Sequence, residues 1–436
     1  MIKILIVSLG CVKNVVDSES VISFLTRNEF EVTNNINECD AIIINTCGFI
    51  DDAKKESINT IIDSLKYKKK LIVIGCLVER YAKELKEEIP EVDLFIPISE
   101  YKHMDALIKG LFNVEVNEPY NPYYRVLSTP SYTAYLKISD GCSNCCAYCA
   151  IPIIRGPFAS VPKELLLKEV DRLISLNVKE LVIISQDTTK YGSDIYSDYN
   201  ITSLLQDILS KNHFISIRLL YLYSYEINDD LLDLFAANQS ILLPYFDIPI
   251  QHSSNKMLKA MNRKDKTEDI ISLVTRIRSR IPNAVLRTTI IVGFPGEQEE
   301  DMEDLLSFIK DIEFDHLGVF KYSREEGTPS YLFSSQIEEN IKEIRYKQVL
   351  SAEQPIAYKK NKSHLNEVLS GIVTDILKDN RYKIRTYLNA PDDIDGDVYL
   401  TVTDDIKLSL GDVVKAVVKE VYIYDIETVY LNKIDK

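Results

Sequence analysis

Short apolar runs alternate with amphipathic stretches through the first 112 residues of the chain. The apolar runs are bounded by polar turn residues and predict strands, whereas the amphipathic stretches repeat apolar positions every three to four residues and predict helices. Strands that alternate with helices predict a parallel, flavodoxin-like sheet. The strands are expected at Lys3–Leu9, Ala41–Asn45, Leu71–Ile74 and Leu94–Pro97, and the helices at Asp17–Asn28, Asp51–Lys66, Glu79–Glu88 and Tyr101–Leu111.

The same alternation resumes at residue 132 and runs for longer. Six β/α units predict a partial or complete TIM-like barrel, which a charged helical stretch at Glu338–Lys362 closes. Amphipathic segments between the strands include Lys163–Leu176, Ile201–Asn212 and Glu297–Asp311. The six strands are expected at Thr133–Ser139, Glu180–Ser185, Ser216–Tyr223, Tyr245–Ile250, Leu286–Gly293 and His316–Tyr322.

The pattern changes again near the carboxyl terminus. Residues 366–436 are rich in Val, Tyr and Asp and carry frequent turn signals, which predicts a small all-β, OB-like barrel. We therefore expect an amino-terminal α/β domain at 1–117, a Pro- and Tyr-rich linker at 118–131, a barrel domain at 132–362 and the small β domain at 366–436.

Composition narrows the functional classes. The 436 residues carry a net charge of −15, so we expect the protein to repel nucleic acid unless it has a local basic patch. No run of 18 apolar residues exists, so no membrane span is expected. The first ten residues, MIKILIVSLG, are too short for the apolar core of a lipoprotein signal and read better as a strand, so we expect a cytoplasmic protein. Eight cysteines in such a protein point to metal ligands or catalysis before disulfides.

Three cysteines follow the first expected barrel strand with the spacing C-x-x-x-C-x-x-C: Cys142, Cys146 and Cys149. Three thiolates this close can hold three irons of a 4Fe–4S cluster and leave the fourth iron open for chemistry. The alternative is a zinc site, because Cys142 and Cys145 form one C-x-x-C pair and Cys146 and Cys149 another. Zinc knuckles usually have a spacer between the pairs, and none is present, so the cluster is favoured and Cys145 is left as a neighbour.

Three more cysteines, Cys11, Cys47 and Cys76, each follow an apolar strand and lie next to a glycine. Because the carboxyl ends of parallel strands meet at one edge of a sheet, these thiols should converge there, and the glycines let the backbone approach a bulky ligand. Three buried, inert cysteines are the alternative. Equivalent positions on three strands favour a second three-cysteine cluster, while Cys39 begins its strand at the opposite edge and is expected to be structural.

Weaker signals lie at other expected strand ends. Gly293, Pro295 and Gly296 form a turn on the edge that carries the cluster and could contact a cofactor, or they could only shape the turn. Arg287 lies inside its expected strand and could pair with a cofactor carboxylate; the alternatives are packing or an ion pair inside the barrel. His103 and His213 read as surface residues. The polar segments at strand ends that could contact substrate are Gln186-Asp187, Gln251-His252 and Tyr322-Ser-Arg324.

Long motifs in the chain resemble the radical S-adenosylmethionine methylthiotransferases. GCSNCCAYCAIPIIRG resembles their radical signature, and SLGCVKNVVDSE, INTCGFIDDAKKES and the pair Gly75-Cys76 resemble their amino-terminal domain. FDIPIQHSSNKMLKAMNR, LRTTIIVGFPGE and FKYSREEGTPS resemble their barrel, and the tail resembles a TRAM domain. One departure is Cys145, which stands where the family often carries a basic residue.

The resemblance implies two 4Fe–4S clusters and S-adenosylmethionine. Cys142, Cys146 and Cys149 match the ligands of the radical cluster, and Cys11, Cys47 and Cys76 match those of an auxiliary cluster whose open iron holds the sulfur to be inserted. One S-adenosylmethionine methylates that sulfur and another yields the 5′-deoxyadenosyl radical, so that C–H becomes C–S–CH3.

The opening motif resembles the RimO-type branch of the family, which modifies the β-carbon of an aspartate in ribosomal protein S twelve. The tail agrees, because it holds six Asp and no Lys or Arg between Thr386 and Ile406 and suits a basic protein better than tRNA. The rivals are a tRNA-adenosine methylthiotransferase and an iron–sulfur electron carrier, although carriers usually close their clusters with four cysteines. Expected partners are the ribosomal protein, a flavodoxin- or ferredoxin-type electron donor and a sulfur donor, and the chain is expected to be a monomer.

Overall fold

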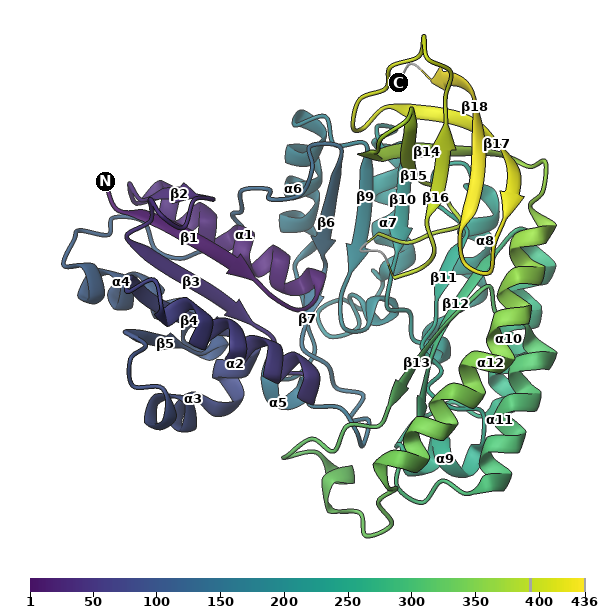
Figure 1. Ribbon diagram of the computed structural model, residues 1–436, viewed down its shortest axis with the longest axis horizontal. Coiled ribbons are helices and arrows are strands. Elements are labelled where there is room, and N and C mark those ends of the chain that lie inside the picture. The colour runs from purple at the N-terminus through teal and green to yellow at the C-terminus, as the bar shows by residue number, and fades with distance from the viewer. Residues whose placement is uncertain (392–393, 435–436) are drawn as a thin grey trace. The chain divides into compact units, whose positions relative to one another are not determined.

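The computed structural model describes residues 1–391 and 394–434, which form two compact units (Figure 1). The first unit holds Met1–Thr129, Lys137–Glu169 and Ser323–Tyr331, so it combines the amino-terminal third of the chain with two later segments. The second unit holds Pro130–Leu136, Val170–Tyr322 and Leu332–Lys436. The loop that carries Cys142, Cys146 and Cys149 therefore belongs to the same unit as Cys11, Cys47 and Cys76.

A five-stranded parallel sheet forms the centre of the first unit, with the flavodoxin-like order β2-β1-β3-β4-β5. Its inner strands are apolar on both faces: Ile43 and Ile72 pack on one side with Phe24, and Ile42 and Val73 pack on the other. A sheet covered on both faces needs such strands, which explains the run Ala41–Thr46. The strands are β1 (Lys3–Ser8), β2 (Glu31–Thr33), β3 (Ala41–Thr46), β4 (Lys70–Gly75) and β5 (Leu94–Ile96).

The four expected strands and four expected helices of this sheet are confirmed, but two helices begin earlier than predicted. Helix α1 starts at Val12 rather than Asp17, and α3 starts at Cys76 rather than Glu79. Strand β2, a three-residue edge strand, was not predicted. The helical elements are α1 (Val12–Arg27), α2 (Asp51–Leu65), α3 (Cys76–Glu88), η1 (Ile98–His103) and α4 (Met104–Phe112).

The segment after α4 contains no helix or strand up to β6, but it is fixed by specific contacts within the first unit. The side-chain amide of Asn28 donates to the Glu118 carbonyl (2.9 Å). The buried Arg125 pairs with Glu19 (2.7 Å) and Glu169 (2.8 Å). The segment expected as a linker is thus packed against α1 and its neighbours.

Six parallel strands of the second unit form two three-stranded sheets, β10-β9-β6 and β11-β12-β13, joined by a bridge between Ile217 and Leu242. All six predicted barrel strands are present. They are β6 (Thr133–Lys137), β9 (Glu180–Ile184), β10 (Ser216–Leu219), β11 (Tyr245–Asp247), β12 (Val285–Val292) and β13 (His316–Lys321). The larger helices are α6 (Lys163–Ser175), α7 (Ile201–Ser210), α8 (Asp229–Ala237), α10 (Thr267–Arg280), α11 (Glu299–Ile312) and α12 (Glu339–Ser363).

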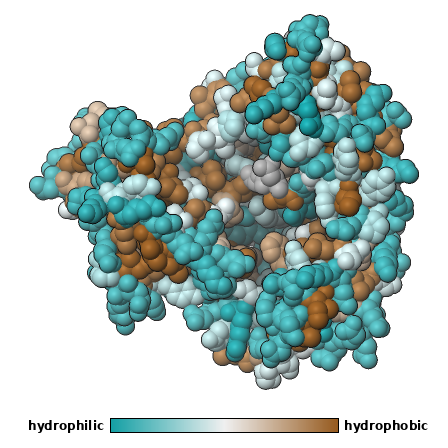
Figure 2. All heavy atoms as spheres, viewed as in Figure 1, coloured by the Kyte–Doolittle hydropathy of each residue, from teal (hydrophilic) through white to brown (hydrophobic). Residues whose placement is uncertain are grey.

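Shorter elements decorate the connections of both units. They are β7 (Ser139–Asp140), α5 (Ile151–Arg155), β8 (Ala159–Ser160), η2 (Thr188–Lys190), η3 (Ser224–Glu226), α9 (Asn255–Ala260) and η4 (Pro329–Leu332). Among residues 1–391 and 394–434, no helix is both long and apolar enough to cross a membrane. In Figure 2 hydrophilic side chains cover most of the outer rim of the second unit, on the right of the view.

A closed five-stranded barrel with the order β14-β15-β16-β18-β17 ends the chain, as predicted. It packs against the amino ends of the strands of the larger barrel. Arg385 pairs with Glu180 at the start of β9, Asp395 pairs with Arg287 of β12 (3.3 Å), and the Leu388 carbonyl lies 2.6 Å from Nε2 of His316. The strands are β14 (Val368–Ile376), β15 (Arg381–Arg385), β16 (Val398–Thr401), β17 (Val413–Val421) and β18 (Ile426–Ile434).

Candidate metal centres

The structure brings Cys11, Cys47 and Cys76 together at the carboxyl edge of the neighbouring strands β1, β3 and β4. A Cβ atom placed on Gly10 would lie 2.9 Å from Sγ of Cys47, so the loop that carries Cys11 touches the Cys47 side chain. Thiolate charge on Cys76 or Cys11 would raise the pKa of Cys47, which places all three sulfurs within electrostatic reach of one another. The convergence expected from the sequence is therefore present.

Glycines make this approach possible. A Cβ on Gly48 would lie 2.7 Å from the backbone of Leu77, and one on Gly75 would lie 2.3 Å from Oδ1 of Asn45. Gly75 also has a φ of +98°, a conformation that residues with a Cβ rarely adopt. The three loops can thus meet only because their glycines carry no side chain.

Polar side chains fix the loops in place. Nδ2 of Asn14 donates to the carbonyls of Leu9 (2.9 Å) and Thr46 (3.0 Å), and so ties the β1 loop to the β3 loop. The hydroxyl of Ser57 accepts from the Cys47 amide (3.0 Å) and donates to the Cys47 carbonyl (2.9 Å). Asn14 and Ser57 are fully buried, and these bonds hold the sulfur-bearing backbone without involving the sulfurs.

The electrostatic surroundings of the thiols are mixed. Burial raises the pKa of Cys47 to about 11, and burial also raises the pKa of Cys76, against the opposing charge of Arg155. Cys11 immediately precedes α1 and Cys76 is the first residue of α3, so both lie at the positive end of a helix dipole. Metal binding to these sulfurs displaces protons from the buried pair.

The second set of cysteines lies on the loop between β7 and α5. The amide of Cys149 donates to the Cys146 carbonyl (3.0 Å), and the amide of Cys142 donates to the Gly156 carbonyl (3.2 Å), so the loop is closed on itself. All three ligand candidates are half-buried. Cys145 differs from these three, because it is exposed and has a φ of +53°.

The two cysteine loops are direct neighbours within the first unit. Cys76 packs in one apolar cluster with Ala150 and Ile154, which follow Cys149 along the chain. Arg155 extends from the same short helix α5, and its Nη2 lies 3.5 Å from Sγ of Cys76. The sequence did not indicate how close the two loops would be, because these contacts join residues more than 70 positions apart.

The segment Ser323–Tyr331 lies against both loops. The Ser330 amide donates to the Ala147 carbonyl (2.9 Å), inside the loop of Cys142 and Cys149. The buried carboxylate of Glu325 pairs with Lys54 (2.9 Å) and Arg80 (2.8 Å), and Arg80 donates in turn to the Gly48 carbonyl (2.7 Å). The motif FKYSREEGTPS thus fixes both cysteine loops by hydrogen bonds and ion pairs, which the sequence did not indicate.

Both sets fit an iron–sulfur cluster by their donors: three thiols each, with a glycine cradle around Cys47 that a side chain would fill. In the part of the chain that the structure describes, no three His, Cys, Asp or Glu side chains lie close enough to hold a single metal ion. A cubane cluster makes a different demand, because each thiolate binds its own iron and the sulfurs stay farther apart.

The turn after β12 lies in the second unit. Gly293 has a φ of +74°, and its amide donates to the carboxylate of Glu297. That carboxylate also binds Nη1 of Arg345 (2.8 Å) and lies 3.2 Å from Nε2 of His252. Nδ1 of His252 accepts from two backbone amides, so Nε2 carries the proton and donates it to Glu297. Packing explains Gly293, since a Cβ there would strike Lys342.

Gly296 differs from Gly293, because nothing lies within 4 Å of the position where its Cβ would stand. Pro295 and Gly296 remain candidates for a cofactor contact. The neighbouring strand end also carries strain, because Gln251 has a φ of +71° although it is not a glycine. Asp187 at the end of β9 is buried and accepts from the Thr189 hydroxyl (2.9 Å).

Arg287 pairs with carboxylates of the protein itself. It is the third of eight residues in β12, inside its strand as expected and near the amino end. Its guanidinium pairs with Asp247 (3.0 Å) and with Asp395 of the small barrel (3.3 Å). The alternative reading, an ion pair inside the barrel, is the one that the structure supports.

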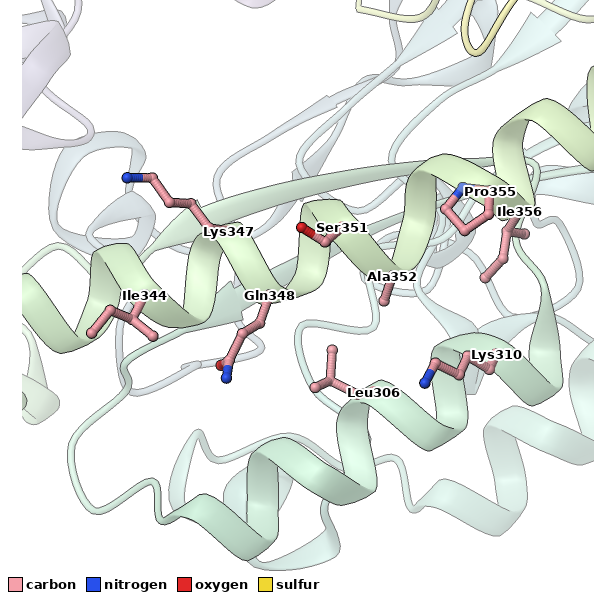
Figure 3. Close-up of a pocket in the computed structure, with 9 residues that line it drawn as sticks. All are labelled: Leu306, Lys310, Ile344, Lys347, Gln348, Ser351, Ala352, Pro355 and Ile356. Atoms are coloured by element: carbon pink, nitrogen blue, oxygen red, sulfur yellow. The ribbon is translucent and has the colours of Figure 1, made fainter.

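A pocket of about 750 Å³ lies between α11 and α12 (Figure 3). Leu306 and Ile356 make part of its wall apolar, and Lys310 and Lys347 are its charged residues. It contains no cysteine, histidine or carboxylate in its lining, so we assign no chemistry to it.

Comparison with known proteins agrees with this arrangement. Residues 3–97 match the family described as uncharacterized protein family UPF0004, and residues 136–309 match the radical SAM superfamily. Among solved structures, the methyltransferase TsrM from Kitasatospora setae has a TM-score of 0.57 at 14% identity, with 76% of each chain covered. The cobalamin-dependent enzyme OxsB has a TM-score of 0.52 at 14% identity, covering 80% of this chain and 56% of that one. These two likenesses concern the fold alone.

Curated relatives are much more similar and match over the full length. The ribosomal protein uS12 methylthiotransferase RimO of Acetivibrio thermocellus is 42% identical over 454 residues, covering 100% of this chain and 99% of the relative. That of Alkaliphilus oremlandii is 44% identical over 401 residues, covering 90% and 91%. That of Clostridioides difficile is 41% identical and covers 98% of both. The chain therefore belongs to the RimO family of radical S-adenosylmethionine methylthiotransferases.

Proposed function

We propose that the protein is a methylthiotransferase that modifies ribosomal protein uS12 with two 4Fe–4S clusters and S-adenosylmethionine, and that the target is the β-carbon of an aspartate. The observation that carries this proposal is the full-length identity of 41–44% to relatives that are named for this activity. The neighbouring cysteine loops add support, because a sulfur-bearing cluster must lie near the place where the radical forms.

The six cysteines have separate roles in this proposal. Cys142, Cys146 and Cys149 bind the radical cluster, and Cys11, Cys47 and Cys76 bind the auxiliary cluster. When bound, the clusters and S-adenosylmethionine supply the electron, the carbon radical and the transferred sulfur and methyl group. The protein supplies the geometry: glycines let the loops meet, and Asn14 and Ser57 hold the backbone of the sulfur-bearing residues.

The acidic tail gives weaker support for a basic substrate than the sequence suggested. Asp395 is buried and binds Arg287 and the Tyr245 hydroxyl (2.6 Å), and Asp397 pairs with Lys383 (2.8 Å). These carboxylates are neutralised within the chain. Asp392 and Asp393, which belong to the same stretch, lie outside the described residues. We therefore base the choice of uS12 over tRNA on the relatives and not on the charge of the tail.

The test separates the two substrates. Anaerobically reconstituted enzyme, S-adenosylmethionine, sulfide and dithionite are incubated with uS12 or with unmodified tRNA, and the products are analysed by mass spectrometry. Replacement of one hydrogen by one methylthio group on uS12, located to an aspartate by peptide fragmentation, is expected. The same gain on tRNA alone would contradict the proposal and favour the tRNA-modifying branch.

A ligand test examines the cysteine assignments. Cys146→Ala should abolish reductive cleavage of S-adenosylmethionine, whereas Cys47→Ala should preserve cleavage but prevent methylthio transfer. Cys145→Ser is the matched control, because it removes a thiol from the same loop and should leave both clusters intact. We further propose a flavodoxin- or ferredoxin-type electron donor, a separate sulfur donor, a monomeric state and a cytoplasmic location.

A further inference from the structure

One buried cation lies between the two cysteine loops. Arg155 ends the short helix α5, six residues after Cys149, and only 2% of its side chain is exposed. Its Nη2 donates to Oδ1 of Asn14 (2.7 Å) and lies 3.5 Å from Sγ of Cys76. An arginine from the loop of one cysteine set therefore touches a sulfur of the other set.

The other nitrogen of the guanidinium, Nη1, pairs with one carboxylate from each of the two cysteine-bearing segments. Nη1 of Arg155 pairs with Asp17 of α1 (2.6 Å) and with Asp140 (3.2 Å), two residues before Cys142. Lys137 binds the same two carboxylates, at 2.6 Å and 2.9 Å. The four groups are neutral in sum, but the member that reaches the sulfur is the positive one.

Water screens this charge little, because the Arg155 side chain is almost fully buried. Cys76 packs in one apolar cluster with Ala150 and Ile154, beside the contact in the chain. A charge in such a place acts on its neighbours far more strongly than one in water. A cation beside a cluster ligand favours the reduced, more negative state of the cluster, as hydrogen bonds and charges near the ligand sulfurs do generally.

We propose that Arg155 is a positioning residue that holds Cys76 against the loop of the radical cluster and raises the reduction potential of the auxiliary cluster. The inference rests on the proposed function, because it takes Cys76 as a cluster ligand. Through Asn14, Asp17 and Asp140, the same side chain links the helix that follows Cys11 to the residues that precede Cys142.

The experiment isolates the auxiliary cluster. In a full-length protein with Cys142, Cys146 and Cys149 changed to Ala, the remaining cluster is titrated with dithionite and followed by electron paramagnetic resonance as one electron converts its 2+ state to 1+. Arg155→Gln removes the charge and Arg155→Lys keeps it. Arg27→Gln is the matched control, since Arg27 ends α1 about 24 Å from Cys11 and makes the same change of charge.

Arg155→Gln is expected to lower the equilibrium constant for reduction at least tenfold, which is about 59 mV for one electron. Arg155→Lys should keep most of the wild-type potential, and Arg27→Gln all of it. Equal potentials in wild type, Arg155→Gln and Arg155→Lys would overturn the inference. Loss of the cluster in both Arg155 variants, with thermal stability of the cluster-free protein unchanged, would support the positioning role. Loss of the cluster together with a lower melting temperature of the cluster-free protein would overturn the inference, because Arg155 would then act only on the stability of the fold.

Failure of the underlying function would look different. If Cys76→Ala, in the same background, still bound a full cluster with the wild-type potential, the ligand assignment would be wrong. If Cys76→Ala lost the cluster while Arg155→Gln kept the wild-type potential, only the role of Arg155 would fall.

Discussion

The carboxylate of Glu325 should be required for the stability of the first unit and for loading of the auxiliary cluster. It is 1% exposed, and its two oxygens bind Lys54, Arg80 and the Ser323 hydroxyl at 2.7–2.9 Å. Glu325→Gln keeps the shape but removes the charge, which leaves the buried guanidinium of Arg80 without its counter-ion. Breaking a buried ion pair from one side costs about 3–5 kcal/mol.

The size of the effect can be measured on the cluster-free protein. For a unit of this size each kcal/mol lowers the melting temperature by about 2–4 °C, so Glu325→Gln should melt roughly 6–12 °C lower at pH 7.5, if about 3 kcal/mol is lost. Arg80 also binds the Gly48 carbonyl, next to Cys47, so less iron should be retained in the auxiliary cluster than in the radical cluster. Iron analysis of variants that keep one cysteine set at a time measures that difference.

The pH dependence of this effect has a definite sign. Burial alone would raise the pKa of Glu325, but the Ser323 hydroxyl, Arg80 and Lys54 outweigh it and the pKa is lowered. The carboxylate therefore stabilises the fold above the pKa of an unfolded glutamate, about 4.3, and this contribution is lost as the pH falls through the lowered pKa. The difference between wild type and Glu325→Gln should shrink in acid. Glu326→Gln is the control, because that neighbour is exposed; equal melting of the two variants at pH 7.5 would refute the reasoning.

Three further outcomes are expected. Gly75→Ala forces a Cβ to within 2.3 Å of Asn45 at a φ of +98°, which costs about 1–3 kcal/mol, and should lose the auxiliary cluster alone by iron analysis; full loading would contradict the cradle. Arg385→Gln should destabilise the second unit by about 3–5 kcal/mol, because it strands the buried Glu180, and a thermal double-mutant cycle with Glu180→Gln should recover most of the loss unless the pair is uncoupled. Burial raises the pKa of Glu353, so its contribution to stability falls as the pH rises through that pKa; Glu353→Gln should melt higher than wild type at pH 8 and not at pH 5, and the reverse order would be inconsistent with a buried acid.

Local patterns predicted the helices and strands well, because the burial of an element determines which positions in a short stretch of sequence are apolar. The run Ala41–Thr46 is buried on both faces and could only be an inner strand. The helix starts were harder to predict, because neither α1 nor α3 begins at a Ser, Thr, Asp or Asn: Cys11 precedes one, and the other follows Gly75 directly. In both cases the residue at the helix start is a proposed ligand, so function displaced the usual capping residue.

Contacts between distant residues could not be predicted from such patterns. Nothing near Arg287 indicated that one of its partners would be Asp395, more than 100 positions later, so the sequence left a cofactor contact, packing and an ion pair inside the barrel as alternatives. Arg155 and Glu325 were missed in the same way, although both lie within motifs that resemble the family. The cysteines were found because the same pattern, a cysteine beside a glycine after an apolar strand, occurs three times. Each of these charged residues stands alone in the sequence, so no repeated pattern pointed to it.

The attachment of the small barrel has a consequence for protein engineering. Its anchors, Glu180, Tyr245, Arg287 and His316, all lie near the beginnings of the large barrel's strands, and each meets a specific group on residues 385–395. A tail from another enzyme that lacked those groups would leave the buried Glu180 without Arg385, and would remove one partner each from Tyr245, Arg287 and His316. Chimeras made to change the substrate therefore have to exchange the tail and these strand-end residues together.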